Sequence, residues 1–151
     1  MSHRSPNERL MRSARLERKP TFVAVVAAAI RDDAGRLLLQ QGLPHKRHAG
    51  LWEFPGGKVE SGETPRFALC REVAEELAIE LAEDALVPAG FADEPSAEGH
   101  PPLVLFLYTS LRWHGEPEAR EGQNWGWFSS AEAGGLDLPP MDRALLRGLS
   151  G

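Results

Sequence analysis

The chain has 151 residues, of which 42% are hydrophobic and 26% are charged, and it carries a net charge of −5. This length suits one globular domain with its own core, and the single cysteine, Cys70, excludes both an intrachain disulfide and a cysteine-based zinc cluster. No run of apolar residues reaches the roughly 18 needed to span a bilayer, so we expect a cytoplasmic protein with no membrane partner.

The charge is distributed unevenly along the chain. Residues 1–20 contain six Lys/Arg and two Glu, a net charge of +4, and the rest of the chain carries −9. We expect residues 1–20 to form a basic extension, either flexible or a short helix, ahead of one domain over residues 21–151. An acidic domain argues against binding to a nucleic-acid polymer. The sequence leaves the choice between a monomer and a homodimer open.

The first part of the domain alternates apolar runs with turn-forming residues. Residues 21–30 are apolar on both faces, which predicts a buried strand. Residues 32–35 predict a hairpin turn, with the return strand over residues 36–41. A loop rich in basic side chains is expected over residues 42–50.

A helix is predicted in the middle of the chain, after a glycine-rich loop. Thr64 is a good N-cap, and Pro65 fits the first helical position. An apolar stripe at a spacing of four residues marks the face that we expect to be buried, and it consists of Leu69, Val73 and Leu77.

The C-terminal half predicts further strands and a last helix. Strands that are apolar on both faces need cover on both faces, so the predicted fold class is α/β, with helices on each side of a mixed sheet. The predicted strands are residues 86–91, 103–111 and 125–128, the loops are residues 92–102 and 116–124, and the helix is residues 142–149, after Pro139-Pro140.

Three glutamates, Glu72, Glu75 and Glu76, share one face of the central helix because they are three and four residues apart. Like charges at that spacing destabilise a helix by about 0.2–0.5 kcal/mol per pair. Converging carboxylates suit a hard divalent cation such as Mg²⁺, and a solvated helix face is the alternative. Glu63 precedes the helix, and Arg71 is placed to bridge it and hold the loop against the helix.

The whole array resembles the Nudix box. Gly57 is followed after five residues by Glu63, and after seven more by the run Arg71-Glu72-Val73-Ala74-Glu75-Glu76. Ala78 stands where the family has glycine, and we expect it to prolong the helix without removing a ligand. The resemblance to Nudix hydrolases implies an α/β/α sandwich around a mixed sheet. It also implies an enzyme that cleaves phosphoanhydride bonds in nucleoside diphosphates linked to another group.

The resemblance also implies a cofactor, Mg²⁺, with Mn²⁺ as the alternative. Such a site would hold the metal, polarise phosphoryl oxygens and orient a water molecule. The implied ligands are Glu72, Glu75, Glu76, the carbonyl of Gly56, and Glu121 in the segment 120–123 (REGQ).

The sequence does not decide which of three glutamates, Glu72, Glu63 or Glu121, is the general base. Glu63 is more suited to a structural contact with Arg71. Lys58 follows the two glycines of the box. It is a candidate to neutralise phosphate charge, and a solvated loop lysine is the alternative.

Motifs outside the box resemble the MutT-like subgroup. They are residues 51–58 (LWEFPGGK), 112–117 (RWHGEP), 120–123 and 138–142 (LPPMD). That subgroup hydrolyses nucleoside triphosphates to the monophosphate and pyrophosphate, and it includes enzymes that remove 8-oxo-dGTP. The resemblance therefore implies a small-molecule nucleotide as substrate and a role in sanitising oxidised or modified nucleotides.

Two departures from the MutT pattern concern the substrate. Gly42 stands where an arginine usually reaches the phosphates, so Lys46 or Arg47 substitutes for it, or phosphate affinity is weaker. Asp142 stands where enzymes that recognise 8-oxoguanine have asparagine. An ionised aspartate only accepts hydrogen bonds, which favours an exocyclic amino group such as that of cytosine or guanine.

Three alternatives stay open, of which the first two concern Asp142. One is a CTP or modified-dCTP pyrophosphohydrolase, or a hydrolase of another nucleoside diphosphate conjugate. A second is that Asp142 only caps the last helix. A third, of a different class, is a nucleotide-sensing module without turnover, against which the intact glutamate set argues.

Overall fold

The computed structural model of the protein describes residues 21–149. The predicted basic extension, residues 1–20, lies outside the described residues, as do the last two residues of the predicted domain. The elements are β1 (Val23–Ala29), β2 (Leu37–Gln41), β3 (Trp52–Glu53), β4 (Gly56–Lys58), α2 (Pro65–Leu77), β5 (Glu80–Leu81), the 3₁₀ turn η1 (Glu83–Ala85), β6 (Leu86–Glu94), β7 (Leu103–Ser110), β8 (Trp113–His114), β9 (Trp125–Phe128), α3 (Ser130–Gly134) and α4 (Pro140–Gly148).

A mixed four-stranded sheet in the order β4-β1-β7-β6 forms the centre of the molecule. β1 and β7 run parallel, from Val23 opposite Leu103 to Ala29 opposite Thr109. β4 and β6 flank them as antiparallel edge strands. A second sheet has the order β3-β2-β9, and β5 pairs with β8. The mixed sheet predicted from the sequence is therefore confirmed.

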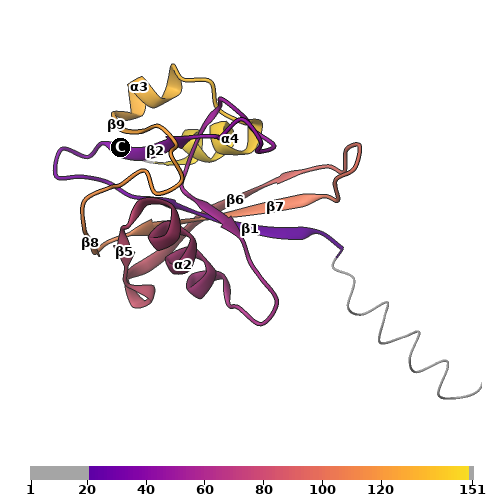
Figure 1. Cartoon of the computed structure of the whole chain (residues 1–151), viewed down its shortest axis with the longest axis horizontal. Coiled ribbons are helices and arrows are strands. Elements are labelled where there is room, and N and C mark those ends of the chain that lie inside the picture. Colours follow the sequence, from indigo (N-terminus) through magenta and orange to yellow (C-terminus); the bar gives the residue numbers. More distant parts are fainter. Residues whose placement is uncertain (1–20, 150–151) are drawn as a thin grey trace, which may run out of the picture.

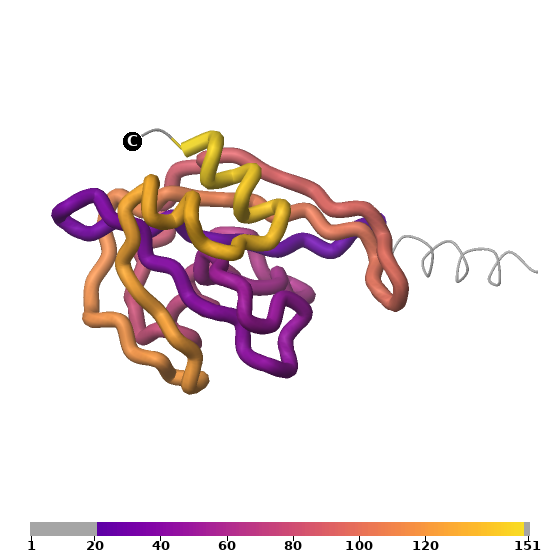
Figure 2. The backbone as a smooth tube through the Cα atoms, turned by 90° about the horizontal axis from the view of Figure 1, so that it is seen from above, coloured from indigo at the N-terminus to yellow at the C-terminus, as the bar shows by residue number. Residues whose placement is uncertain are grey.

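Helices cover both faces of the four-stranded sheet (Figure 1), with α2 on one face and α4 on the other. Side chains alternate along β1, so that Val26 and Ala28 pack with Leu69 of α2, whereas Ala27 packs with Leu145 of α4. The predicted α/β class, with helices on each side of the sheet, is confirmed. Seen from above, α4 lies over the strands while the β6–β7 hairpin extends beyond it (Figure 2).

The start of α2 follows the sequence prediction and its end does not. The Thr64 hydroxyl accepts a hydrogen bond from the Phe67 N–H at 3.2 Å, and Pro65 occupies the first turn. Ala78 was expected to prolong the helix, but it ends the helix in the left-handed conformation with φ 59°. That conformation costs a non-glycine residue roughly 1–2 kcal/mol, so tertiary packing holds the chain there.

Two further predictions are only partly confirmed. The turn at residues 32–35 forms, since the Gly35 N–H donates to the Asp32 carbonyl at 2.9 Å and the flanking residues pair at the antiparallel bridge between Arg31 and Leu37. The pairing ends within a few residues of the turn, because β1 and β2 belong to different sheets. β2 pairs instead with β9 and β3. β6 extends to Glu94 rather than residue 91, because its partner β7 continues to pair with it as far as Leu103.

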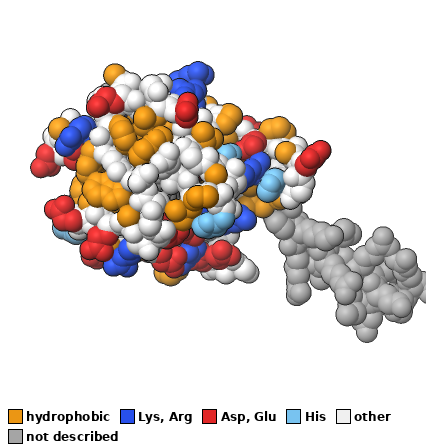
Figure 3. Space-filling view, turned by 45° about the horizontal axis from the view of Figure 1, so that its top comes forward, with side chains coloured by type: hydrophobic (Ala, Val, Ile, Leu, Met, Phe, Trp, Pro, Cys, Tyr) orange, Lys and Arg blue, Asp and Glu red, His pale blue; other side chains and the backbone are white. Residues whose placement is uncertain are grey.

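The surface mixes charge and apolar groups. Hydrophobic side chains occupy the middle of the face in Figure 3, and acidic and basic side chains alternate around its margin. Within residues 21–149, no helix is both long enough and apolar enough to cross a membrane.

Candidate active site

A cavity of about 620 Å³ lies on the α4 side of the four-stranded sheet, a volume typical of small-molecule sites. One end reaches the glutamates of α2, and the other reaches Met141 and Asp142 of α4. Among the residues predicted to be functional, its lining includes Gly56, Lys58, Glu72, Glu76, Glu121, Lys46, Arg47 and Asp142.

Glu76 is the most enclosed carboxylate at the α2 end. Its residue is 8% exposed, and one carboxylate oxygen accepts a hydrogen bond from the Gln40 side-chain amide. Burial, together with the neighbouring carboxylates of Glu72 and Glu121, raises the pKa of Glu76 to about 9. The ionised form of this group therefore needs a nearby positive charge.

Two buried glutamines position this end of the cavity, and the sequence analysis did not identify them. The Gln123 side-chain amide donates to the Gln40 side-chain oxygen at 3.0 Å and to the Glu76 carbonyl at 2.9 Å. The Gln123 side-chain oxygen accepts from the Glu121 N–H at 3.1 Å, which fixes the loop that carries Glu121. For Gln40 the signal in the sequence was a polar residue after three leucines, and for Gln123 it was membership of the segment 120–123 (REGQ), in which only Glu121 was assigned a role.

Arg71 makes the bidentate contact expected from the sequence. Its guanidinium donates to the two carboxylate oxygens of Glu63 at 2.6 and 2.7 Å. This contact lowers the pKa of Glu63 and raises the pKa of Arg71. Arg71 also donates to Glu72 at 3.0 Å and to Glu75 at 3.3 Å. The loop is thus held against the helix, as predicted.

Two glycines allow the β4 backbone to approach its neighbours closely. A Cβ atom on Gly57 would lie 2.4 Å from the carboxylate carbon of Glu72, and one on Gly56 would lie 1.9 Å from the Val26 carbonyl oxygen. At Gly56 the backbone leaves no room for a side chain, and at Gly57 a side chain would displace the Glu72 carboxylate. These contacts place the carboxylate of Glu72 directly against the backbone of the box.

The expected metal ligands do not all lie together. Glu75 does not line the cavity, its side chain is 60% exposed, and it contacts Arg71. Across residues 21–149, no three His, Cys, Asp or Glu side chains converge as a preformed ion site. The donor chemistry nevertheless fits a hard divalent cation, because the cavity brings carboxylates to one end and buries Glu76 among like charges.

The opposite end of the cavity contains a second pair of acids. Asp142 is 4% exposed, and its carboxylate accepts a hydrogen bond from the Phe54 N–H at 3.0 Å. Burial raises the pKa of Asp142 to about 7. Burial and the neighbouring Asp142 also raise the pKa of Glu53 to about 7. Glu53 was not identified from the sequence, where it reads as an ordinary strand residue.

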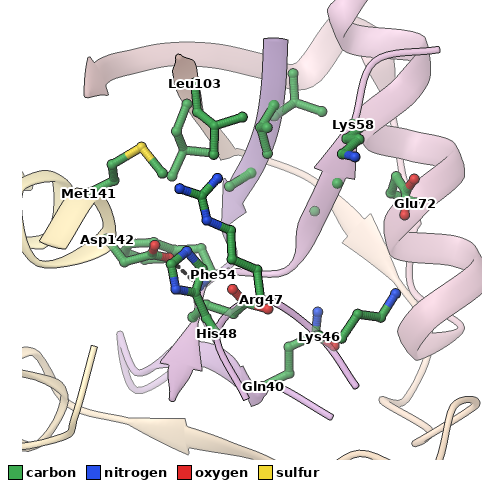
Figure 4. A pocket seen from close by; sticks show the side chains of 18 of the residues that line it. Gln40, Lys46, Arg47, His48, Phe54, Lys58, Glu72, Leu103, Met141 and Asp142 are labelled. Atoms are coloured by element: carbon green, nitrogen blue, oxygen red, sulfur yellow. Dashed lines mark hydrogen bonds between the residues drawn. The ribbon is translucent and has the colours of Figure 1, made fainter. Parts of the chain in front are cut away.

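The alternative that Asp142 merely caps the last helix is wrong. α4 begins at Pro140, its N-cap is Pro139, and no side chain caps the helix. The Asp142 carboxylate points instead to the Phe54 backbone, and the dashed line in Figure 4 marks this contact.

The loop over residues 42–50 folds back on its own first residue. A Cβ atom on Gly42 would lie 2.3 Å from the His48 carbonyl oxygen, so this loop path excludes an arginine at position 42. In Figure 4, Lys46 extends toward the side of the cavity where Glu72 lies, whereas Arg47 extends toward Leu103. Arg47 donates to Glu94 at 2.8 Å.

Comparisons with known proteins agree with this arrangement. Residues 20–149 match the family described as NUDIX domain. The 8-oxo-dGTP diphosphatase of Haemophilus influenzae is 36% identical over 130 residues, which covers 85% of this chain and 91% of that protein. The CTP pyrophosphohydrolase of Escherichia coli is 40% identical over 125 residues, covering 83% and 89%. The structure is similar to a MutT NUDIX hydrolase from Burkholderia pseudomallei, with a TM-score of 0.72 at 32% identity, covering 87% of this chain and 100% of that one.

Proposed function

The chain belongs to the Nudix hydrolase family, and on that premise we propose that it hydrolyses a nucleoside triphosphate to the monophosphate and pyrophosphate. We propose that the substrates are oxidised or modified nucleotides, with 8-oxo-dGTP first among them. One observation carries the proposal. A single cavity joins a carboxylate cluster suited to a metal–triphosphate with a buried acid, Asp142, suited to a base.

The α2 end of the cavity supports dependence on Mg²⁺, or on Mn²⁺ in its place. Glu72, Glu76 and Glu121 with the Gly56 carbonyl would hold the ion, and Glu75 would join them from the rim. Bound there, the ion supplies Lewis-acid polarisation of the phosphoryl oxygens and lowers the pKa of bound water.

The protein groups around this end divide into contacts with substrate and contacts within the protein. Lys58 and Lys46 line the cavity and would neutralise phosphate charge. Glu72 or Glu121 would accept a proton from the attacking water. Both oxygens of Glu63 accept hydrogen bonds from Arg71, so we assign Glu63 and Arg71 to holding the loop and not to proton transfer.

Asp142 is suited to reading the base in either of two protonation states. With its pKa near 7, a protonated carboxyl can donate to a carbonyl group while the ionised form only accepts. The protonated form resembles an asparagine amide in offering a donor, which supports 8-oxo-dGTP. The ionised form supports CTP or a modified dCTP as the second candidate substrate. The similarity to a protein named CTP pyrophosphohydrolase also supports this candidate.

A substrate panel tests the proposal. The panel contains 8-oxo-dGTP, dGTP, CTP, 5-methyl-dCTP, ADP-ribose and a dinucleoside polyphosphate, each with Mg²⁺. We expect a triphosphate to have the highest kcat/KM and to yield monophosphate and pyrophosphate, separated by ion-exchange chromatography. Release of orthophosphate, or a preference for ADP-ribose, would overturn the assigned reaction. Tight nucleotide binding without pyrophosphate release would instead identify a sensing module.

A further inference from the structure

Arg47 reaches across the cavity to a residue far along the chain. Its guanidinium donates to the Glu94 carboxylate at 2.8 Å, and the two side chains are 23% and 25% exposed. The second carboxylate oxygen of Glu94 is buried and, among residues 21–149, has no hydrogen-bond partner. Arg47 is the side chain that hydrogen-bonds Glu94, and His48 is also close enough to interact with the Glu94 charge. The ion pair fixes where the Arg47 guanidinium lies.

The position of Glu94 places Arg47 away from the glutamates of α2. Glu94 pairs with Leu103 at the end of β6, the edge strand opposite β4. Three strand spacings of about 4.8 Å separate β6 from β4, which makes roughly 14 Å. Glu72 packs against β4, so Arg47 and Glu72 belong to opposite ends of the cavity.

The surroundings of Arg47 are those of the Asp142 end. Figure 4 shows its guanidinium near Leu103 and Met141, on the same side as Asp142. Asp142 and Met141 come from α4, and Glu94 lies beside Met141 in a shallow recess between β6 and α4. Only one of the Arg47 nitrogens is engaged by Glu94, and a guanidinium carries five N–H donors.

We propose that Arg47 contacts the nucleobase of the substrate and not its phosphates, and that Glu94 is the positioning residue that holds it there. This inference rests on the proposed function, because it assumes a nucleotide substrate and assigns Arg47 to the base of that nucleotide. The remaining N–H groups of Arg47 donate to an acceptor atom of the base, while Asp142 hydrogen-bonds another edge. In Figure 4, Lys46, the neighbour of Arg47, points away from Arg47 toward the side where Glu72 lies, and its charge also acts on Glu53.

Calorimetric binding of two kinds of probe tests the division between Arg47 and Lys46. The probes are the nucleoside monophosphates 8-oxo-dGMP and CMP, and tripolyphosphate, which has no nucleoside. We expect Arg47→Ala to weaken binding of the preferred monophosphate roughly 10- to 100-fold, as for loss of hydrogen bonds from a charged donor. Tripolyphosphate binding should change less than about twofold. Lys46→Ala should weaken tripolyphosphate more than monophosphate.

Matched variants separate the base contact from a structural effect. Arg112→Ala removes an arginine from an exposed ion pair with Asp84, neither of which lines the cavity, and should change the binding of neither probe. Glu94→Gln should raise the KM for the triphosphate, while kcat stays within about threefold of the wild-type value. This pattern is expected when a residue positions a group that binds the substrate and takes no part in the chemical step. In the Arg47→Ala background, Glu94→Gln should have no further effect on either probe. The double variant also removes both charges, so a folding defect from an unpaired Glu94 does not obscure the result.

The outcomes distinguish this inference from the proposed reaction. Equal weakening of tripolyphosphate and monophosphate in Arg47→Ala, or weakening of tripolyphosphate alone, would overturn the base contact. Unchanged KM and monophosphate binding in that variant would overturn it as well, even if pyrophosphate is released. If the protein binds the monophosphate through Arg47 but releases no pyrophosphate, the contact between Arg47 and the base is supported and the proposed hydrolysis is rejected.

Discussion

Glu75 and Glu76 are neighbours in α2, yet their surroundings differ. Glu76 is buried and contacts Gln40, whereas Glu75 is exposed and contacts Arg71 outside the cavity. Burial strengthens the electrostatic interaction of a carboxylate with any cation beside it. The two positions should therefore contribute unequally to turnover, although the sequence pattern treats them alike.

The first prediction concerns these two glutamates. Glu76→Gln should lower kcat by about 10²–10³ at saturating Mg²⁺, the usual cost of removing one electrostatic stabiliser. Glu75→Gln should lower it by about tenfold or less, because its side chain is 60% exposed. Steady-state rates on the best substrate of the panel measure both. Equal losses in the two variants would contradict the unequal roles.

The second prediction concerns pH and the buried acid at the other end. The pKa of Asp142 is about 7 in the folded protein and about 3.9 in an unfolded chain. Between those values the folded state holds a proton that the unfolded state has released, so stability falls as pH rises from about 4 to about 7. Glu53, whose pKa is also about 7, acts in the same direction.

Asp142→Asn should flatten this pH dependence. The free energy of unfolding of the variant minus that of wild type should increase by roughly 2 kcal/mol when the pH is raised from 5 to 8. This is less than the full three-unit pKa shift of Asp142 would give. Urea titrations at the two pH values measure the difference, and Asp33→Asn in the exposed turn serves as control. An identical pH slope in wild type and Asp142→Asn would mean that Asp142 is already ionised at pH 5.

At the scale of elements, the loop over residues 42–50 depends on the absence of a side chain at its first residue. Gly42→Ala places a Cβ atom 2.3 Å from the His48 carbonyl oxygen, so the loop must move. We expect a loss of about 1–3 kcal/mol in stability and a higher KM, because Lys46 and Arg47 are on the same loop. Thermal melts and KM measure the two effects.

Gly134→Ala is the matched control for that variant. Nothing lies within 4 Å of a Cβ atom at Gly134, which is in α3 and away from the cavity lining. Its KM should stay near that of wild type, and its melting temperature should stay the same or rise slightly, because alanine restricts the unfolded chain. If Gly42→Ala behaves in the same way, the loop is free to take another path.

The end of α2 offers a prediction of the opposite sign. Ala78 has φ 59°, a conformation that glycine adopts without a steric penalty. Ala78→Gly should therefore stabilise the protein by about 0.5–1 kcal/mol after the entropy of the more flexible unfolded chain is counted. Chemical denaturation checks this. A loss of stability would show that the Ala78 methyl group packs more favourably than its backbone is strained.

At the scale of the whole molecule, one cavity collects residues from the two larger sheets and from the helices α2 and α4. Without a bound cation, the repulsion among the carboxylates of Glu72, Glu76 and Glu121 lowers the stability of the folded state. A ligand that binds only the folded state stabilises it by about 2.7 kcal/mol at 100 times its Kd. Mg²⁺ should therefore raise the melting temperature of wild type, and a chelator should reverse the shift.

Glu76→Gln provides the comparison for metal binding. This variant should melt at a temperature that depends weakly on Mg²⁺, because the most buried carboxylate is gone. Differential scanning fluorimetry with Mg²⁺, Ca²⁺ and no added metal measures the shift. The same Mg²⁺ shift in wild type and Glu76→Gln would place the ion elsewhere on the protein.

The sequence by itself determined the features that depend on nearby residues. The start of α2 at Thr64-Pro65 and the contact between Arg71 and Glu63 follow from spacing along one helix and its preceding loop. The α/β class followed from strands that need cover on both faces. Such features are local, so hydrogen-bonding capacity and hydrophobic period are enough to predict them.

Only the tertiary structure decided what each charged group does in the cavity. Gln40 and Gln123 enclose Glu76, Phe54 engages Asp142, and these contacts join residues 36, 47 and 88 positions apart. Arg47 finds Glu94 because β6 lies at the far edge of the sheet. The burial and pairing of charged groups depend on which distant segments of the chain meet. The order of the strands in a sheet cannot be predicted from the hydrophobic periodicity of each strand. The sequence therefore identified the residues of the box, and the fold decided which side chains share one cavity.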